Sequence, residues 1–487
     1  MLDDDKETGS AVVATGNPLA ARAARQMLLA GGSAVDAAIA ADAVLGVVEP
    51  MATGIGGDLL AMLVPHDGPA LCYNGTGRSP AALTTAMIDA LPGRRIPERH
   101  PLSVTVPGVV RGWHDLHRRY GRLPWRSLFN VAIAAARTGF VVAPVSAREW
   151  ALFAHVLRRD PACALLYKAE AVPASGEVFI NTELAALLEA IAAEGPDAFY
   201  DGAVADAAQS AVQARGGVLA SSDFTAHKGN FDIPLSTRFR DLTVLECPPN
   251  THGIAVLDTL AAIDSLPLAA DDPQATVSVV HAMRVALERA KKTVADPSGN
   301  TVCTVVVDFQ GLAITLMSSI FKRFGSGIAV PGAGFVLQNR GFGFSLPGHI
   351  NGPEPSKRPY HTVVPAAALK DGRFHSSFGV VGGAMQPQGH VQLLLRTAAW
   401  GEGVQSAIDA PRWRLESDTA LALEVGTPTP VREALRAAGF VEPDNIGELG
   451  GRSDFGGAQM VMRLDDGRLV GGSDPRKDGI ARVVVMR

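Results

Sequence analysis

Apolar residues recur along the chain with two spacings, one helical and one strand-like. The helical spacing predicts long helices at residues 18–30, 34–49, 110–120, 183–194 and 274–293. Short β-branched runs predict strands, which gather late in the chain at residues 301–308, 312–319, 378–381, 459–462 and 481–485. The pattern therefore predicts a mixed α and β protein whose long helices mostly precede residue 301.

The first two helices carry start and stop signals. Asn17 and Pro18 supply an N-cap and a first helical residue, and Gly31-Gly32 ends that helix. Ser33 caps the second helix, with Asp36 three residues later as an acidic capping partner. Because the second helix is apolar nearly all round, we expect it to be buried between layers.

The strands at 301–308 and 312–319 form a predicted hairpin. The three residues between them end in glycine, which is a favoured connection. That loop length pairs Thr301 with Ser319, whereas a four-residue loop would pair Thr301 with Ser318. Either register places a hydroxyl opposite Thr301.

Thr301 opens this strand directly after Gly299-Asn300, and two interpretations are open. It is either a strand residue after a turn, or the first residue of a new chain produced by a cut before it. A free α-amino group has an ordinary pKa of about 7.7–8.0 and could take the hydroxyl proton of its own threonine. Cys303, on the same strand face, is a rival nucleophile without an activating partner in the sequence. Gly382-Gly383 follows a strand and could offer backbone N–H groups to an oxyanion.

Composition narrows the class of protein. Of 487 residues, 47% are hydrophobic and 19% charged, which suits a large globular core, and the length alone suggests two or three domains. The net charge of −5 and the lack of a Lys/Arg run argue against a nucleic-acid partner. The acidic start has no signal-like apolar segment, and the apolar stretch 34–48 is too short to span a bilayer. We therefore expect no membrane partner and a cytoplasmic location.

No sequence pattern indicates a cofactor or a metal ion. The glycine-rich segments "TGIGGD" and "GTGRSP" do not fit the dinucleotide-binding fingerprint. The four cysteines are scattered without metal-ligand spacing, so we expect free thiols. The sequence thus predicts an enzyme or binding protein without a bound cofactor.

Seven segments follow one another along nearly the whole chain. They read "NPLAARAARQMLLAGGSAVDAAIAADAVLGVVEPMATGIGGD", "TVPGVVRGWHDLHRRYGRLPW", "LAALLEAIAAEGPDAFYDG", "FGSGIAVPGAGFVLQNR", "KRPYHTVVPAAAL", "AIDAPRW" and "GGSDPRKDG". Together they resemble the γ-glutamyltransferase family of N-terminal nucleophile hydrolases. The resemblance implies an α+β fold, a four-layer αββα sandwich. It also implies a precursor that cuts itself into a large subunit, 1–300, and a small subunit, 301–487, intertwined in one structural domain and able to pair as a dimer.

The resemblance also assigns roles at the reaction centre. Thr301 falls on the family's nucleophile, and Ser319 on the hydroxyl that supports it. Gly382 and Gly383 fall on the family's oxyanion-hole pair. The residues that carry out the chemistry are therefore expected to be present.

The family's glutamate clamp, in contrast, is largely replaced. The replacing residues are Val302-Cys303 for Thr-His, Phe321 for Asn, Gly343 for the Asp that holds the α-amino group, His361 and Thr362 for two serines, and Thr76 for an Arg. Arg78, two residues after Thr76, is a candidate anion anchor on the same strand face. The segments "NRGFGFSL", "KRPYHT" and "GGAMQPQ" are closer to the family's oxamate amidohydrolase branch.

Three functions follow from this comparison. The first is a self-processing threonine amidohydrolase that acts through an acyl-enzyme on a small, carboxylate-bearing amide, with Arg78, His361 and Thr362 as substrate contacts. The second is γ-glutamyl transfer or glutathione hydrolysis with an altered clamp. The third is an uncut, non-catalytic binding protein, which the short segment between the helix ending at Thr293 and Thr301 would favour.

Overall fold

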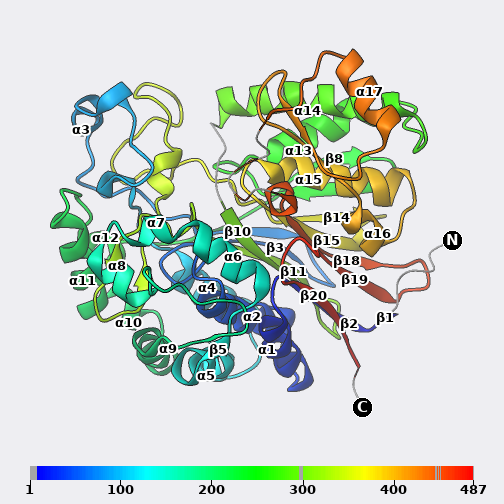
Figure 1. Ribbon diagram of the computed structural model, residues 1–487. Coiled ribbons are helices and arrows are strands. Elements are labelled where there is room, and N and C mark those ends of the chain that lie inside the picture. Colours follow the sequence, from blue (N-terminus) through cyan, green and yellow to red (C-terminus); the bar gives the residue numbers. More distant parts are fainter. Residues whose placement is uncertain (1–7, 295–299, 445–446, 448, 450, 486–487) are drawn as a thin grey trace.

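Two seven-stranded sheets lie face to face in the computed structural model, with helices outside each sheet (Figure 1). The structure describes residues 8–294, 300–444, 447, 449 and 451–485. The layers are helix, sheet, sheet and helix, so the predicted αββα sandwich is confirmed.

The first sheet is antiparallel throughout. Its strands, in spatial order, are β1 (Thr8–Gly9), β19 (Leu469–Ser473), β18 (Gly457–Arg463), β15 (Arg373–Val381), β14 (Ala366–Lys370), β9 (Leu242–Glu246) and β8 (Leu235–Phe239).

The second sheet is also antiparallel. Its strands, in order, are β20 (Ile480–Val484), β2 (Ala11–Thr15), β10 (Asn300–Val307), β11 (Ala313–Phe321), β3 (Asp58–Val64), β4 (Leu71–Asn74) and β7 (Asn230–Asp232). Both sheets therefore combine strands from before and after residue 300.

Alternate side chains of both sheets fill the space between them. Val12, Leu60 and Val305 of the second sheet pack in one cluster with Ala367 and Val461 of the first. Alternation along a strand sends the neighbouring side chains outward, toward the helices. Val302 and Val306, for example, belong to the outer core of the second sheet.

Two groups of helices cover the outer faces. Those over the second sheet are α1 (Pro18–Leu29), α2 (Ala34–Val48), α4 (Val109–Tyr120), α5 (Asn130–Thr138) and α9 (Thr182–Glu194). Those over the first sheet are α13 (Gly253–Ile263), α14 (Pro273–Thr293), α15 (Met385–Leu394), α16 (Val404–Asp409) and α17 (Thr429–Ala437). Figure 1 shows the second group above the sheets and the first group below them.

The remaining α-helices and strands of the described residues lie around these layers or in the connections between them. They are α3 (Thr85–Asp89), α6 (Pro144–Leu152), α7 (Ala154–Leu157), α8 (Pro161–Leu166), α10 (Asp197–Tyr200), α11 (Ala203–Gln213), α12 (Ser221–Thr225), β5 (Phe140–Val141), β6 (Val178–Phe179), β12 (Ala329–Val330), β13 (Phe335–Val336), β16 (Trp413–Leu415) and β17 (Leu421–Leu423).

The helix start signals act as the sequence predicts. Asn17 caps α1, with its side chain accepting from the Leu19 N–H. Ser33 and Asp36 form a complete capping box at the start of α2. Every residue of α2 is buried, as expected of a helix that is apolar all round.

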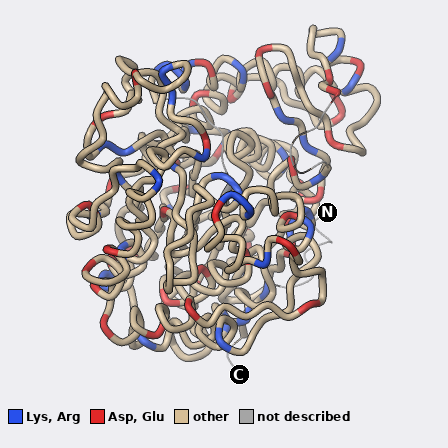
Figure 2. The backbone as a smooth tube through the Cα atoms, turned by 60° about the vertical axis from the view of Figure 1, so that its left-hand side comes forward, with Lys and Arg blue, Asp and Glu red and all other residues tan. Residues whose placement is uncertain are grey.

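The surface and the cysteines agree with the composition. Figure 2 shows basic and acidic positions interspersed along the backbone. Cys72, Cys163, Cys247 and Cys303 are all buried free thiols. Within the described residues, no helix is both long and apolar enough to cross a membrane.

Candidate active site

Thr301 lies at the start of β10, where the hairpin ladder is interrupted. The Asp308 N–H donates to the Leu312 carbonyl at 3.0 Å, and Val302 pairs with Ser318, so the three-residue loop sets the register. The register shifts between Asn300 and Val302, which leaves Thr301 at a bulge rather than in a ladder pair with Ser319. Bulges of this kind re-aim a side chain.

The Thr301 hydroxyl is held by Gln386, in the first turn of α15. Gln386 Nε2 donates to Thr301 Oγ1 at 2.9 Å. Gln386 Oε1 accepts from the Val364 N–H at 3.0 Å, which fixes which end of the amide faces the threonine. Sequence reasoning missed Gln386, because its partners Thr301 and Val364 lie far from it in the sequence.

The two neighbouring serines of β11 have different surroundings. Ser318 Oγ donates to Asp42 Oδ1 of α2 at 2.5 Å, on the helix side of the sheet. Ser319 Oγ accepts from the Phe321 N–H at 2.9 Å and from Arg340 Nη2 at 3.1 Å. The structure therefore places Ser319 next to the Arg340 guanidinium.

Gly382 and Gly383 turn the chain from β15 into α15. Their φ angles are +116° and +60°, a region that favours glycine. Their carbonyls accept from the N–H groups of Met385 and Gln386, the residue that holds Thr301. Neither glycine N–H donates a hydrogen bond within the described residues, so both donors are available to a reacting oxygen.

Arg340 joins several predicted site residues, and sequence reasoning missed it. It begins a 3₁₀ turn, Arg340–Gly343, and is 0% exposed. Its Nη1 donates to Thr362 Oγ1 at 3.2 Å, its Nη2 reaches Ser319, and its guanidinium carbon lies 4.1 Å from the centre of the Phe321 ring. Burial lowers the Arg340 pKa to about 10, so the group stays charged at neutral pH.

Asp58, the first residue of β3, is the carboxylate of this cluster. It accepts from the Gly77 N–H at 2.7 Å, from Gln338 Nε2 at 2.8 Å and from His361 Nε2 at 3.2 Å. Burial alone would raise its pKa, but the His361 hydrogen bond and the nearby Arg340 charge hold the pKa below its ordinary value. Asp58 is thus ionised and orients His361.

His361 is neutral at ordinary pH. Its Nδ1 accepts from the Val363 N–H at 3.1 Å, which leaves the proton on Nε2, facing Asp58. Burial, with the Arg340 charge adding to it, lowers the His361 pKa to about 4. A neutral imidazole next to a cation and a carboxylate can orient a polar ligand without adding charge.

Arg78 lies apart from these groups. It is exposed, and its Nη1 donates to the Ser356 carbonyl at 3.1 Å. Of the predicted substrate contacts, the structure therefore brings His361 and Thr362 together at Arg340 and leaves the Arg78 side chain at the surface.

Cys303 is poorly suited to act as a nucleophile. Burial raises the pKa of its thiol well above the ordinary value, so the thiolate is not populated at neutral pH. Its sulfur packs against β15, where a Cβ at Gly379 would lie 2.7 Å from Sγ. Within the described residues, no group of three or more His, Cys, Asp or Glu side chains could hold a metal ion.

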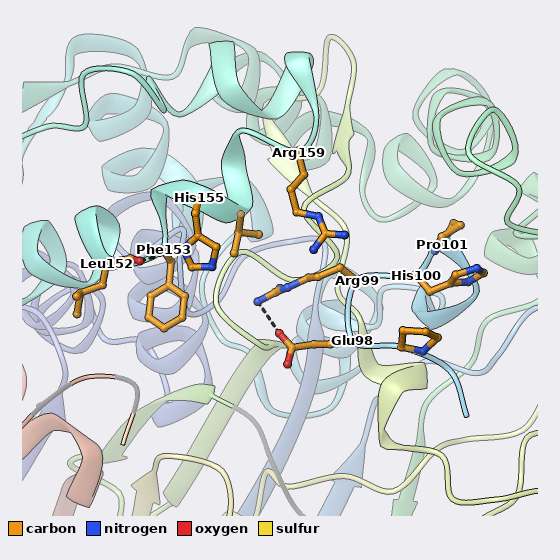
Figure 3. Close-up of a pocket in the computed structure, with 10 residues that line it drawn as sticks. Glu98, Arg99, His100, Pro101, Leu152, Phe153, His155 and Arg159 are labelled. Carbon is orange, nitrogen blue, oxygen red and sulfur yellow. Dashed lines mark hydrogen bonds and ion pairs between the residues drawn. The ribbon is translucent and has the colours of Figure 1, made fainter. Parts of the chain in front are cut away.

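An open hollow of about 740 Å³ lies outside this cluster (Figure 3). It is lined by residues 97–101 and by residues from 152 to 159, and Arg99 Nη2 pairs with Glu98 Oε1 at 2.8 Å. The Glu98 carbonyl accepts from Asn339, the neighbour of Arg340. None of the predicted site residues lines this hollow.

A family profile and several known proteins match nearly the whole chain. The family profile described as Gamma-glutamyltranspeptidase matches residues 20–303 and 290–484. The oxamate amidohydrolase proenzyme of Klebsiella pneumoniae is 33% identical, over 95% of this chain and 96% of its own. The glutathione hydrolase-like YwrD proenzyme of Bacillus subtilis is 31% identical over the same shares, 95% and 96%.

A solved structure extends the comparison to three dimensions. The cephalosporin acylase from Bacillus halodurans has a TM-score of 0.90 at 30% identity, covering 98% of this chain and 97% of its own. The family profile, the sequence relatives and this solved structure indicate one family. The chain is a hydrolase of C–N bonds and belongs to the γ-glutamyltranspeptidase family of N-terminal nucleophile hydrolases.

Proposed function

We propose that the chain is a self-processing threonine amidohydrolase for a small, carboxylate-bearing amide such as oxamate. The observation that carries the proposal is the arrangement around α15. Its first turn holds the Thr301 hydroxyl through Gln386, and the residues just before it, Gly382 and Gly383, offer two unused N–H donors. A nucleophile and an oxyanion hole are thereby tied to one rigid element.

The first reaction is the cut before Thr301. Thr301 Oγ1 attacks the carbonyl carbon of Asn300, the C–N bond breaks, and the acyl group moves from nitrogen to oxygen. Water then hydrolyses the ester, which leaves residues 1–300 and 301–487 and frees the Thr301 α-amine. The bulge at Thr301 supports this step, because it takes the residue out of the ladder.

The second reaction uses the freed amine. It takes the Oγ1 proton while Oγ1 attacks the amide carbon, and the amide nitrogen leaves with a proton as ammonia. The N–H groups of Gly382 and Gly383 stabilise the tetrahedral oxyanion. Water hydrolyses the Thr301 ester, and oxamate would yield oxalate and ammonia.

Glutathione hydrolysis is the weaker candidate, although several relatives are named as glutathione hydrolases or glutathione hydrolase-like. The turn Arg340–Gly343 carries a cation and no carboxylate, so it would repel the ammonium of a γ-glutamyl group. We expect no measurable release from a γ-glutamyl anilide under conditions in which oxamate is consumed.

The test is the Thr301→Ala variant, assayed for cleavage by mass and for ammonia release from oxamate. We expect loss of both. Thr304→Ala is the matched control, since Thr304 lies in the same strand but hydrogen-bonds Thr15 at 2.8 Å. A Thr301→Ala protein that is cleaved and active would refute the proposal.

A further inference from the structure

Arg340 is a buried cation whose hydrogen-bonding capacity is only partly used. A guanidinium has five N–H donors. Nη1 and Nη2 each donate one hydrogen bond, to Thr362 and Ser319. Nε donates to no partner within the described residues, although Asp58 Oδ2 lies 3.6 Å away. Donors on one edge of the group therefore remain for a further acceptor.

Asp58 does not accept a hydrogen bond from the free Nε donor of Arg340. Its two oxygens already accept from Gly77, Gln338 and His361, all at 3.2 Å or less. The 3.6 Å contact with Arg340 Nε is longer than a hydrogen bond. An unpaired buried donor is costly, so an additional anionic acceptor would stabilise the site.

The charges around Asp58 favour an anion. Arg358 donates to the carbonyls of residues 74, 76 and 228 and to the Asn230 side chain, all neutral acceptors. Arg340 and Arg358 both interact with Asp58, and Arg358 also interacts with Asp232. A charged guanidinium whose donors are only partly used attracts a carboxylate and disfavours an ammonium.

We propose that Arg340 binds the substrate's carboxylate in the cleaved protein, a proposal that rests on the proposed function. Arg340 is one hydrogen bond from Ser319, and Val302 pairs with Ser318, so Ser319 is a close cross-strand neighbour of Thr301. This closeness favours a substrate whose carboxylate lies near the scissile carbonyl, as in oxamate.

The surrounding turn fits a short, flat anion. The Phe321 ring covers one face of the guanidinium, with 4.1 Å between the guanidinium carbon and the ring centre. Gly343, in the same turn, adds no side chain above Phe321, where a Cβ would be 3.9 Å from the ring. Planar carboxylates bind the fork of an arginine in two parallel hydrogen bonds.

The test compares oxamate with oxamide, which replaces the carboxylate by a neutral amide of similar size. The Arg340→Met variant should lower kcat/KM for oxamate about 30-fold or more, with a much smaller change for oxamide. If Arg340 had a purely structural role, the variant would lower kcat/KM equally for oxamate and oxamide. That result would overturn the proposal. Arg78→Met tests the rival anchor, and loss of oxamate preference only in that variant would also overturn it.

Oxalate binding, measured by calorimetry on the purified protein, separates this proposal from the proposed function. We expect oxalate to bind the wild type and to bind Arg340→Met at least 10-fold more weakly, even if neither protein hydrolyses an amide. If the Met variant does not fold, Arg340→Lys replaces it in this measurement, because lysine keeps the positive charge opposite Asp58. The Lys variant should also bind oxalate several-fold more weakly than the wild type. No oxalate binding by the wild type, or equal binding by the variants, would overturn the proposal.

Discussion

At the residue scale, single amide and carboxyl groups hold the residues of the candidate active site in place. Gln386 touches the Thr301 hydroxyl on one side and the Val364 backbone on the other. Asp42 anchors Ser318 from the opposite side of the same sheet and also accepts from Trp113 at 2.8 Å. Substituting one of these buried polar groups should therefore change a specific property, either turnover or the pH dependence of stability.

Replacing Gln386 by Leu should lower kcat about 10-fold or more with little change in KM, because Thr301 Oγ1 loses the donor that positions it. Steady-state kinetics on oxamate measure this. Gln392→Leu is the matched control, since Gln392 is buried in the same helix and accepts from the Trp413 N–H at 3.0 Å. Equal kinetic losses in both variants would show that Gln386 acts only through stability.

Asp42 should make the free energy of unfolding depend on pH. Burial raises its pKa from the ordinary 3.8 to about 6, so the folded state holds the proton more tightly. Its contribution is fully present below about pH 4 and is lost as pH rises through 6, roughly 3 kcal/mol in total. Denaturant unfolding of wild type and Asp42→Asn, both in the uncut Thr301→Ala background, should show this difference between pH 4 and 7. A difference that stays constant with pH would contradict the assignment.

At the element scale, the turn between β15 and α15 orients the backbone of the candidate site. Gly382 has φ +116°, and a Cβ there would lie 3.0 Å from the Gly456 Cα. The turn aims two N–H groups while the helix that follows carries Gln386. Its geometry, rather than any side chain, sets the proposed oxyanion hole.

Gly382→Ala should therefore lower kcat on oxamate about 100-fold or more, because the turn must shift to relieve both the contact and the φ strain. Gly372→Ala is the matched control: Gly372 also has a positive φ, +74°, but a Cβ there meets nothing within 4 Å. The control should lose some stability and keep its turnover. Normal kcat in Gly382→Ala would rule out this turn as the oxyanion hole.

Local signals in the sequence predicted the helices and strands better than they predicted the residues of the candidate active site. The Ser33–Asp36 capping box and the Asp308–Leu312 hairpin loop were predictable because all their partners lie within a few residues. The contacts of Arg340 and Gln386 were not predictable, because their partners lie on strands that are distant in the sequence. No rule of sequence spacing connects these residues. The bulge at Thr301 was also missed, since a register shift leaves no mark in strand alternation.

At the scale of the whole molecule, the segments on either side of residue 300 build both sheets together. β10 lies between β2 and β11, and β11 in turn pairs with β3. A cut before Thr301 would therefore leave two fragments joined by sheet hydrogen bonds and by the core between the sheets. We expect them to remain in one particle until the protein unfolds.

The intact mass of freshly purified protein, measured after native gel filtration and again after prolonged incubation, tests the central claim most directly. We predict two fragments from one elution peak, 1–300 and 301–487, with Thr301 as the first residue of the smaller one. A single mass for the full 487-residue chain, unchanged on incubation, would contradict a self-processing nucleophile at Thr301 and favour an uncut binding protein.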